Sequence, residues 1–236
     1  MENIFSLFKN RLPNFLGDLV TDTAESFQFR KEANHRPVLV IPGFMANDHT
    51  TVILRSALLS SGFTPYAWNK GTNIIASDQL LEDLNQELHK IYEKHNNTPV
   101  VIIGWSMGGF YARALAHMSP NIVNSVITLG TPFKQEINFE EMRLKYSKIG
   151  INIDDYPIKQ HYLDLMKIVP VVPFTSLYSK VDMIAPYEAS LEEITPITEN
   201  VEVMTGHFGM VCDPEALKII VNRCMEEKAT WKKYQI

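Results

Sequence analysis

The sequence predicts an α/β fold in which a mostly parallel β-sheet is flanked by helices. Three observations lead to this prediction. From His35 onward, short apolar runs alternate with longer segments of helical periodicity, which is the pattern of βαβ units. The predicted strands are apolar throughout rather than alternating, as expected where helices cover both faces of a sheet. The length of 236 residues, 45% of them hydrophobic, is enough for a sizeable core.

Local signals mark the elements in the first half of this region. One helix is expected to end at Gly62, because glycine readily adopts the conformation that ends helices. Another is expected to begin at Ser77 or Asp78, either of which can cap it, and its leucines recur at helical spacing. These signals predict a strand over Pro37–Pro42, a helix over His49–Gly62, a strand over Phe63–Asn69, a helix over Ser77–His95, a strand over Pro99–Gly104 and a helix from Ser106.

The second half continues the alternation with one interruption. Strands are predicted over Asn124–Gly130, Pro173–Ser179 and Asn200–Gly206, followed by a helix over Asp213–Lys228 that Asp213 caps. The first two of these strands are separated by about forty residues, which is longer than a plain crossover needs. We therefore expect residues 132–170, which contain two helix-like stretches, to form a cap or lid over the edge of a single domain spanning residues 35–236.

Residues 1–34 are expected to form an N-terminal amphipathic helical segment. Glu2, Pro13 and Asp18 interrupt its apolar residues, so it resembles neither a signal peptide nor a membrane span. We expect it to pack against the domain. The alternative is peripheral membrane contact through its Phe and Leu side chains, although it has few basic residues. A cytoplasmic location is the default expectation.

Charge and cysteine content limit the classes of partner and cofactor. The net charge is −5, the isoelectric point is near 5.8 and no basic block is present, so we expect no nucleic-acid partner. The two cysteines, Cys212 and Cys224, are too few for a disulfide framework and lack the spacing of zinc ligands. Neither a metal nor an organic cofactor is expected.

The residues from Gly104 to Gly108, Gly-Trp-Ser-Met-Gly, contain the strongest functional signal. They fit the pattern G-x-S-x-G and lie between a predicted strand and a predicted helix, as this motif requires. A serine on such a sharp turn has its hydroxyl lifted clear of the main chain, and the glycines two positions away have no room for a β-carbon. This context makes Ser106 a candidate nucleophile rather than an ordinary helix cap.

With this motif, the chain from about Arg36 to Cys224 resembles the α/β-hydrolases, and among them the small lipase- and esterase-like members. The resemblance implies an α/β-hydrolase fold with an eight-stranded or slightly trimmed sheet. It also implies a catalytic triad of serine, acid and histidine in that order along the chain.

A base and an acid are available in the order that the resemblance implies. His207 alone among the seven histidines follows a late predicted strand, in a loop that Gly206 and Gly209 make permissive. Asp182 follows the predicted strand that ends near Tyr178, where the acid of the family lies. A surface histidine and an ordinary turn aspartate are the alternative interpretations.

The loop after the first strand resembles the oxyanion-hole loop of the family, with Pro42 in place of histidine. We expect one backbone N–H donor from Phe44, with Met45 as the second choice, and another from Met107. Met45 and Trp105 are candidate substrate contacts. Asn73, in the loop after the second strand, is either a further contact or only a turn residue.

These residues predict a serine hydrolase that cleaves carboxylic esters, of lipids or other apolar acyl compounds, through an acyl-enzyme. The apolar side chains of the predicted cap favour such substrates. Acyl transfer and thioester hydrolysis by the same triad are alternatives. A non-catalytic lipid- or partner-binding protein on the same fold is an alternative of another class.

Overall fold

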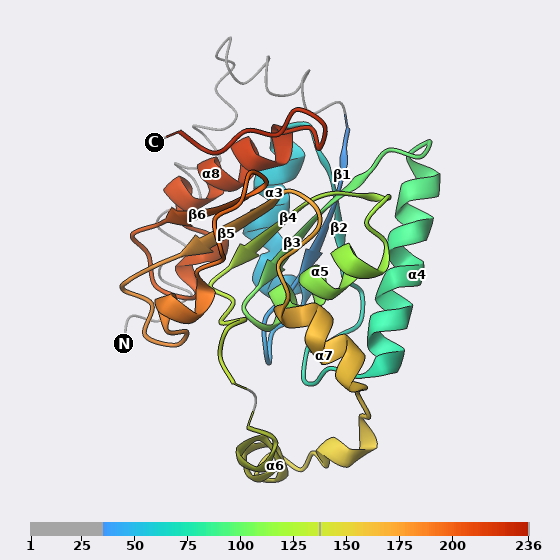
Figure 1. Ribbon diagram of the computed structural model, residues 1–236, viewed down its shortest axis with the longest axis vertical. Coiled ribbons are helices and arrows are strands. Elements are labelled where there is room, and N and C mark those ends of the chain that lie inside the picture. The colour runs from blue at the N-terminus through green and yellow to red at the C-terminus, as the bar shows by residue number, and fades with distance from the viewer. Residues whose placement is uncertain (1–34, 137, 236) are drawn as a thin grey trace.

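A computed structural model describes residues 35–136 and 138–235 of the chain (Figure 1). The predicted amphipathic segment over residues 1–34 lies outside the described residues. The described chain contains a six-stranded, fully parallel sheet with the strand order β2-β1-β3-β4-β5-β6. Its strands are β1 (Pro37–Ile41), β2 (Thr64–Ala67), β3 (Val100–Trp105), β4 (Val123–Leu129), β5 (Phe174–Tyr178) and β6 (Thr198–Glu202). The prediction of an α/β fold with a mostly parallel sheet is confirmed.

Helices cover both faces of the sheet (Figure 1). The helices are α3 (Val52–Ser60), α4 (Asp78–Lys94), α5 (Met107–Met118), α6 (Phe139–Ser147), α7 (Gln160–Lys167) and α8 (Pro214–Met225), with 3-10 turns at Asp48–Thr51, Ile153–Asp155, Tyr187–Ser190 and Gly209–Val211. Val38 and Val40 of β1 pack with α3 and α8, whereas Leu39 and Ile41 pack with α4, α5 and α7. Both faces of a strand are therefore buried, which explains its uninterrupted apolar sequence.

The predicted helix signals act as expected. The Ser77 side chain accepts a hydrogen bond from the N–H of Leu80 at 3.2 Å and so caps α4. Asp213 accepts bonds from the N–H groups of Glu215 and Ala216 and caps α8 in the same way. Each cap satisfies backbone donors that have no partner within the helix.

Strand β6 differs from its predicted position. It begins at Thr198 and ends at Glu202, whereas the apolar pattern predicted Asn200–Gly206. The early start buries Glu199, which accepts hydrogen bonds from the Thr175 hydroxyl at 2.7 Å and from Arg223 at 3.1 Å. A buried carboxylate with such partners is compatible with a strand interior, but a hydrophobic pattern does not reveal it.

The segment predicted as a cap divides into two parts. Helix α6 and the 3-10 turn Ile153–Asp155 lie apart from the sheet (Figure 1), and we call residues 139–158 the cap. Its Tyr146 hydroxyl donates a hydrogen bond to the carbonyl of Ile74 at 2.8 Å. Helix α7 instead packs on α5 as part of the main core. Only the first part of the insertion therefore stands away from the main body, across the cavity described below.

The order of the strands fixes where a site can form. The chain moves outward from β1 to β2 and then crosses back to β3 on the other side of β1. The carboxyl ends of β1 and β3 therefore lie at a topological switch point, which is where open α/β sheets bind ligands. The predicted oxyanion loop leaves β1 at this edge, and Ser106 follows β3.

Candidate active site

Ser106 occupies a strained turn between β3 and α5. Its backbone angles are φ 51° and ψ −120°, in a region that L-residues rarely adopt. Its N–H donates to the carbonyl of Leu129 at 2.8 Å, and its carbonyl accepts from the Thr131 hydroxyl at 2.9 Å. Such strain costs about 1–3 kcal/mol and persists only where neighbouring structure holds it. The neighbouring strand β4 and the loop after it provide that support.

The glycines of the motif are required by close packing around the turn. A β-carbon on Gly104 would lie 2.4 Å from the carbonyl oxygen of Gly108. One on Gly108 would lie 2.3 Å from the carbonyl oxygen of Ile41, and one on Gly109 only 2.0 Å from Oγ1 of Thr131. The predicted crowding on either side of Ser106 is confirmed.

Asp182 and His207 form a buried pair. Oδ2 of Asp182 lies 2.6 Å from Nδ1 of His207, and the two side chains are 1% and 4% exposed. The other carboxylate oxygen, Oδ1, accepts hydrogen bonds from the N–H groups of Ile184 at 2.8 Å and Ala185 at 3.0 Å. The carboxylate is thus oriented by its own loop, and it in turn fixes the imidazole ring.

This pair lies beside the strand end that carries Ser106. Trp105, the residue before the serine, donates from its indole N–H to the carbonyl of His207 at 3.1 Å, and the two rings lie 5.7 Å apart. A β-carbon on Gly130, at the end of β4, would lie 3.1 Å from both Oδ2 of Asp182 and Nδ1 of His207. The acid, the base and the serine therefore lie at one edge of the sheet.

Trp105 has a different place from the one predicted. Its side chain is buried in the core on the α3 and α8 face of the sheet, and it does not line the cavity described below. Its ring and N–H contact His207 instead. The structure thus replaces the predicted substrate contact with a contact to the candidate base, because side chains alternate between the two faces of a strand.

The predicted oxyanion loop lies against the serine turn. A β-carbon on Gly43 would lie 3.1 Å from Cβ of Ser106. The N–H of Met45 donates to the carbonyl of Asn73 at 2.7 Å and is therefore not free to bind an oxyanion. Within the described residues, the N–H of Phe44 has no acceptor, and that of Met107 begins α5, where the helix provides none. The structure thus leaves the N–H groups of Phe44 and Met107 without an acceptor, and their role in an oxyanion hole stays a prediction.

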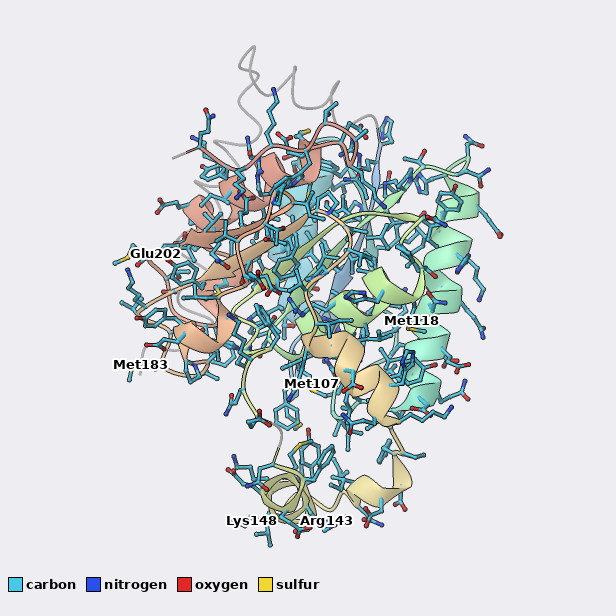
Figure 2. The ribbon with its side chains drawn as sticks, in the orientation of Figure 1. Met107, Met118, Arg143, Lys148, Met183 and Glu202 are labelled. Atoms are coloured by element: carbon cyan, nitrogen blue, oxygen red, sulfur yellow. The ribbon has the colours of Figure 1, made fainter. Side chains whose placement is uncertain are left out.

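A cavity of about 790 Å³ separates the cap from the main body. Phe44, Met45 and Met107 line it at the candidate oxyanion site, and Phe44 lies 5.6 Å from the ring of Tyr146. Figure 2 shows Met107 at the end of the body that faces α6. The remaining apolar lining consists of Ile75, Ala76, Phe110, Tyr111, Phe139, Met142, Ile149, Ile153, Tyr156, Pro157, Ile158, Leu163 and Met166.

The polar side chains around the cavity are paired or neutral. Arg143 of the cap binds Asp154 at 2.7 Å, and Lys145 binds a carboxylate of its own helix. Burial raises the pKa of Tyr146 to about 12, so its hydroxyl stays neutral while it donates to Ile74. The cavity is therefore suited to an apolar ligand rather than to a highly charged one.

Comparison with known proteins agrees with this geometry. A family model described as the alpha/beta hydrolase fold matches residues 36–150, which include the oxyanion loop and the serine turn. The chain belongs to the α/β-hydrolase superfamily. This α/β-hydrolase is also 30% identical, over 128 residues, to GPI inositol-deacylase A of Yarrowia lipolytica. The match covers 50% of this chain, which spans only 11% of that relative.

Solved structures show the same fold at low sequence identity. Lipase B of Aspergillus fumigatus superposes with a TM-score of 0.61 at 14% identity, covering 82% of this chain and 53% of the lipase. An esterase of Exiguobacterium antarcticum gives a TM-score of 0.60 at 15% identity, covering 82% and 93%. The thioesterase domain of the curacin biosynthetic pathway gives 0.53 at 13% identity, covering 80% and 92%. These similarities establish the α/β-hydrolase architecture.

The contacts of two residues of this α/β-hydrolase were not predicted from its sequence. Gly130, at φ +57°, has no β-carbon, and this lets Asp182 and His207 pack closely against the end of β4. Asn73, for which the sequence left a substrate contact and a turn residue open, is fully buried and donates to the carbonyl of Pro42 in the oxyanion loop. The sequence holds one weak signal for each: a glycine directly after a strand, and a polar residue near apolar Ile74 and Ile75.

Over residues 35–136 and 138–235, this α/β-hydrolase has no group of three or more His, Cys, Asp or Glu side chains that could hold a metal ion. Over the same ranges, no helix is both long and apolar enough to cross a membrane.

Proposed function

We propose that this α/β-hydrolase is a serine hydrolase that cleaves carboxylic esters of lipids or other apolar acyl compounds through an acyl-enzyme. The observation that carries the proposal is the buried Asp182–His207 pair at the sheet edge where Ser106 occupies its strained turn. A hydroxyl is a poor nucleophile near neutral pH, so it needs a base and a group that orients the base. The pair has both.

The reaction is expected to follow the order of these groups. The Ser106 hydroxyl oxygen attacks the acyl carbon while His207 takes its proton, and the N–H groups of Phe44 and Met107 stabilise the resulting oxyanion. His207 then protonates the leaving alcohol as the C–O bond breaks. Water, activated by His207, releases the acid from Ser106. Throughout, Asp182 holds the imidazole and stabilises its charged form.

The apolar nature of the acyl group is inferred from the cavity. Its volume of about 790 Å³ is within the usual range for ligand sites, and Phe44 and Met107 belong to both the cavity wall and the proposed oxyanion hole. An acyl chain in the cavity would therefore have its carbonyl close to the N–H donors. The name of the Yarrowia lipolytica relative describes removal of an acyl group, which agrees with this class of reaction.

The test combines a series of p-nitrophenyl esters of increasing acyl length with the variant Ser106→Ala. We expect turnover by the wild type and a loss in kcat on the order of 10⁶-fold in the variant. Ser61→Ala is the matched control, because Ser61 is a buried serine bonded to the carbonyl of Ala57, at the end of α3. It should keep full activity.

A fluorophosphonate probe separates the proposal from its alternatives. Covalent labelling of Ser106 in the wild type would support a serine hydrolase. A folded wild-type protein with neither labelling nor turnover would contradict it and favour the non-catalytic binding protein. Acyl-CoA substrates, assayed with and without an acceptor alcohol, distinguish thioester hydrolysis and acyl transfer from ester hydrolysis.

A further inference from the structure

Asn73 contacts the oxyanion loop, residues 42–46, on both sides of Phe44. Its side-chain amide donates to the carbonyl of Pro42 at 2.7 Å. Its backbone carbonyl accepts from the N–H of Met45 at 2.7 Å, and its backbone N–H donates to the carbonyl of Ala46 at 2.7 Å. Three hydrogen bonds from one fully buried residue therefore hold the two ends of the segment that carries the Phe44 N–H.

The side-chain amide of Asn73 is oriented by Tyr111. The tyrosine hydroxyl donates to Oδ1 of Asn73 at 3.0 Å, which leaves the amide NH₂ to face Pro42. The tyrosine ring is itself fully buried and stacks on Trp68 with ring centroids 6.4 Å apart. Because burial raises the pKa of Tyr111, its hydroxyl remains protonated and available as a donor.

This network joins the two halves of the proposed oxyanion hole. Tyr111 belongs to α5, the helix that begins with Met107. The carbonyl of Pro42 also packs against the first turn of α5, since a β-carbon on Gly108 would lie 2.7 Å from it. The loop that carries one N–H donor is thus fixed to the helix that carries the other.

Inside the loop, the N–H of Ala46 donates to the carbonyl of Gly43 at 3.1 Å and closes a turn around Phe44. The side chains of Phe44 and Met45 are 45% and 54% exposed, and Met45 has a φ of 56°, which is unfavourable for a residue with a side chain. In addition, Pro42 occupies the position where the family that this chain resembles has a histidine. The proline side chain cannot donate a hydrogen bond. The bonds from Asn73 therefore add support from outside the loop to its internal hydrogen bond.

We propose that Asn73 is a positioning residue of the oxyanion hole, which rests on the proposed function of this site. It fixes the peptide between Gly43 and Phe44 so that its N–H, with that of Met107, meets the developing oxyanion. Oxyanion stabilisation depends on donors held in place before the reaction, so loosening the loop lowers the rate of the chemical step more than it weakens substrate binding.

The test is Asn73→Asp, which retains size and the acceptor for Tyr111 but removes the donor to Pro42. We expect kcat for a p-nitrophenyl ester to fall about 10- to 100-fold, with KM changed less than about threefold. The corresponding thionoester is the second substrate, because its sulfur accepts weaker hydrogen bonds. The ratio of the oxoester rate to the thionoester rate should therefore fall as well.

Asn124→Asp is the matched control. Asn124 is a buried asparagine at the start of β4, and its amide donates to the backbone carbonyl of Glu226 at 2.9 Å, at the opposite edge of the sheet. The two substitutions remove the same kind of bond and should lower the melting temperature similarly. Only Asn73→Asp should lower kcat and the oxoester preference.

Tyr111→Phe tests the same network without introducing a charge, and so covers the case in which Asn73→Asp does not fold. It should lower kcat about fivefold, the value of one net hydrogen bond, with the same fall in the rate ratio.

The outcomes separate this inference from the proposed function. If the wild type shows Ser106-dependent turnover but the Asn73 and Tyr111 variants match Asn124→Asp in kcat and rate ratio, the positioning role is wrong and the hydrolase remains. If the variants lower oxoester and thionoester rates equally, the role is also wrong. If the wild type shows no Ser106-dependent turnover, both proposals fail.

Discussion

Replacing Asp182 by asparagine should nearly abolish activity while leaving the fold intact. The two side chains have the same shape, and Oδ1 of the carboxylate accepts the N–H groups of Ile184 and Ala185. An asparagine oxygen can keep both bonds, so its NH₂ group must face Nδ1 of His207, where Oδ2 stands in the wild type. In the opposite orientation of the asparagine amide, its NH₂ group would face the N–H groups of Ile184 and Ala185. These two backbone donors would then be unpaired, at a cost in stability of about 1–3 kcal/mol each.

The magnitude follows from the proton on the imidazole. With an NH₂ donor opposite Nδ1, this nitrogen must become the acceptor and the ring carries its proton on Nε2. The nitrogen that should take the proton of Ser106 is then already occupied. Losing the correct tautomer in this way lowers kcat about 10⁴-fold, equivalent to about 5.5 kcal/mol of transition-state stabilisation.

The assay compares kcat for a p-nitrophenyl ester and the melting temperature in Asp182→Asn and in Asp213→Asn. Asp213 is a close structural match, because its Oδ1 also accepts two backbone N–H groups, those of Glu215 and Ala216, but it caps α8. Asp213→Asn should keep full activity. Retention of more than about a tenth of kcat by folded Asp182→Asn would refute the assigned role of the carboxylate.

Two further predictions concern packing. Gly130→Ala should cost about 1–2 kcal/mol of stability from its φ of +57° and should also lower kcat, because the new methyl group contacts the acid–base pair. Gly150→Ala, at φ +76° with no neighbour within 4 Å, should show the stability cost in denaturant unfolding without the activity loss, and equal activity in the two variants would contradict this explanation. Arg113→Met should cost about 3–5 kcal/mol because it leaves the buried Glu192, 2.6 Å from Arg113, without its partner. Adding Glu192→Gln should restore part of that loss, and a single variant as stable as the wild type would show that the pair is dispensable.

Most of the fold was predictable because its strands are buried on both faces. Such strands have apolar sequences bounded by helix caps and glycines, and these local signals determine the order of the elements. The predicted bounds of strand β6 lay too far along the chain because Glu199 is buried with Arg223 as its partner. This interaction joins residues that are distant in the sequence. The cap boundary was too broad for a similar reason: α7 has the sequence of an amphipathic helix, but only its packing on α5 places it in the body.

The candidate site was predictable where chemistry depends on local sequence. The turn at Ser106 needs glycines at fixed distances, and Asp182 and His207 each follow a strand in the expected order. The side chain of Trp105 was predicted to face the substrate, but it lies in the core. The direction of a side chain at the end of a strand depends on the register of the sheet, which the sequence alone does not give. Asn73 was left undecided, since only the folded chain places it against Pro42.

Under the proposed function, the two halves of an ester would lie on different sides of the site. Phe44 and Met107 border the cavity under the cap, whereas His207 is held by Trp105 and Asp182 and is not part of the cavity lining. In the proposed reaction the acyl chain therefore enters the cavity and the leaving alcohol lies toward His207. Selectivity should accordingly depend on acyl length more than on the alcohol, because the walls of the cavity would contact the acyl chain. A second ester series, in which the alcohol is varied at fixed acyl length, tests this expectation. If kcat/KM depends more strongly on the alcohol than on acyl length, the acyl chain does not bind in this cavity.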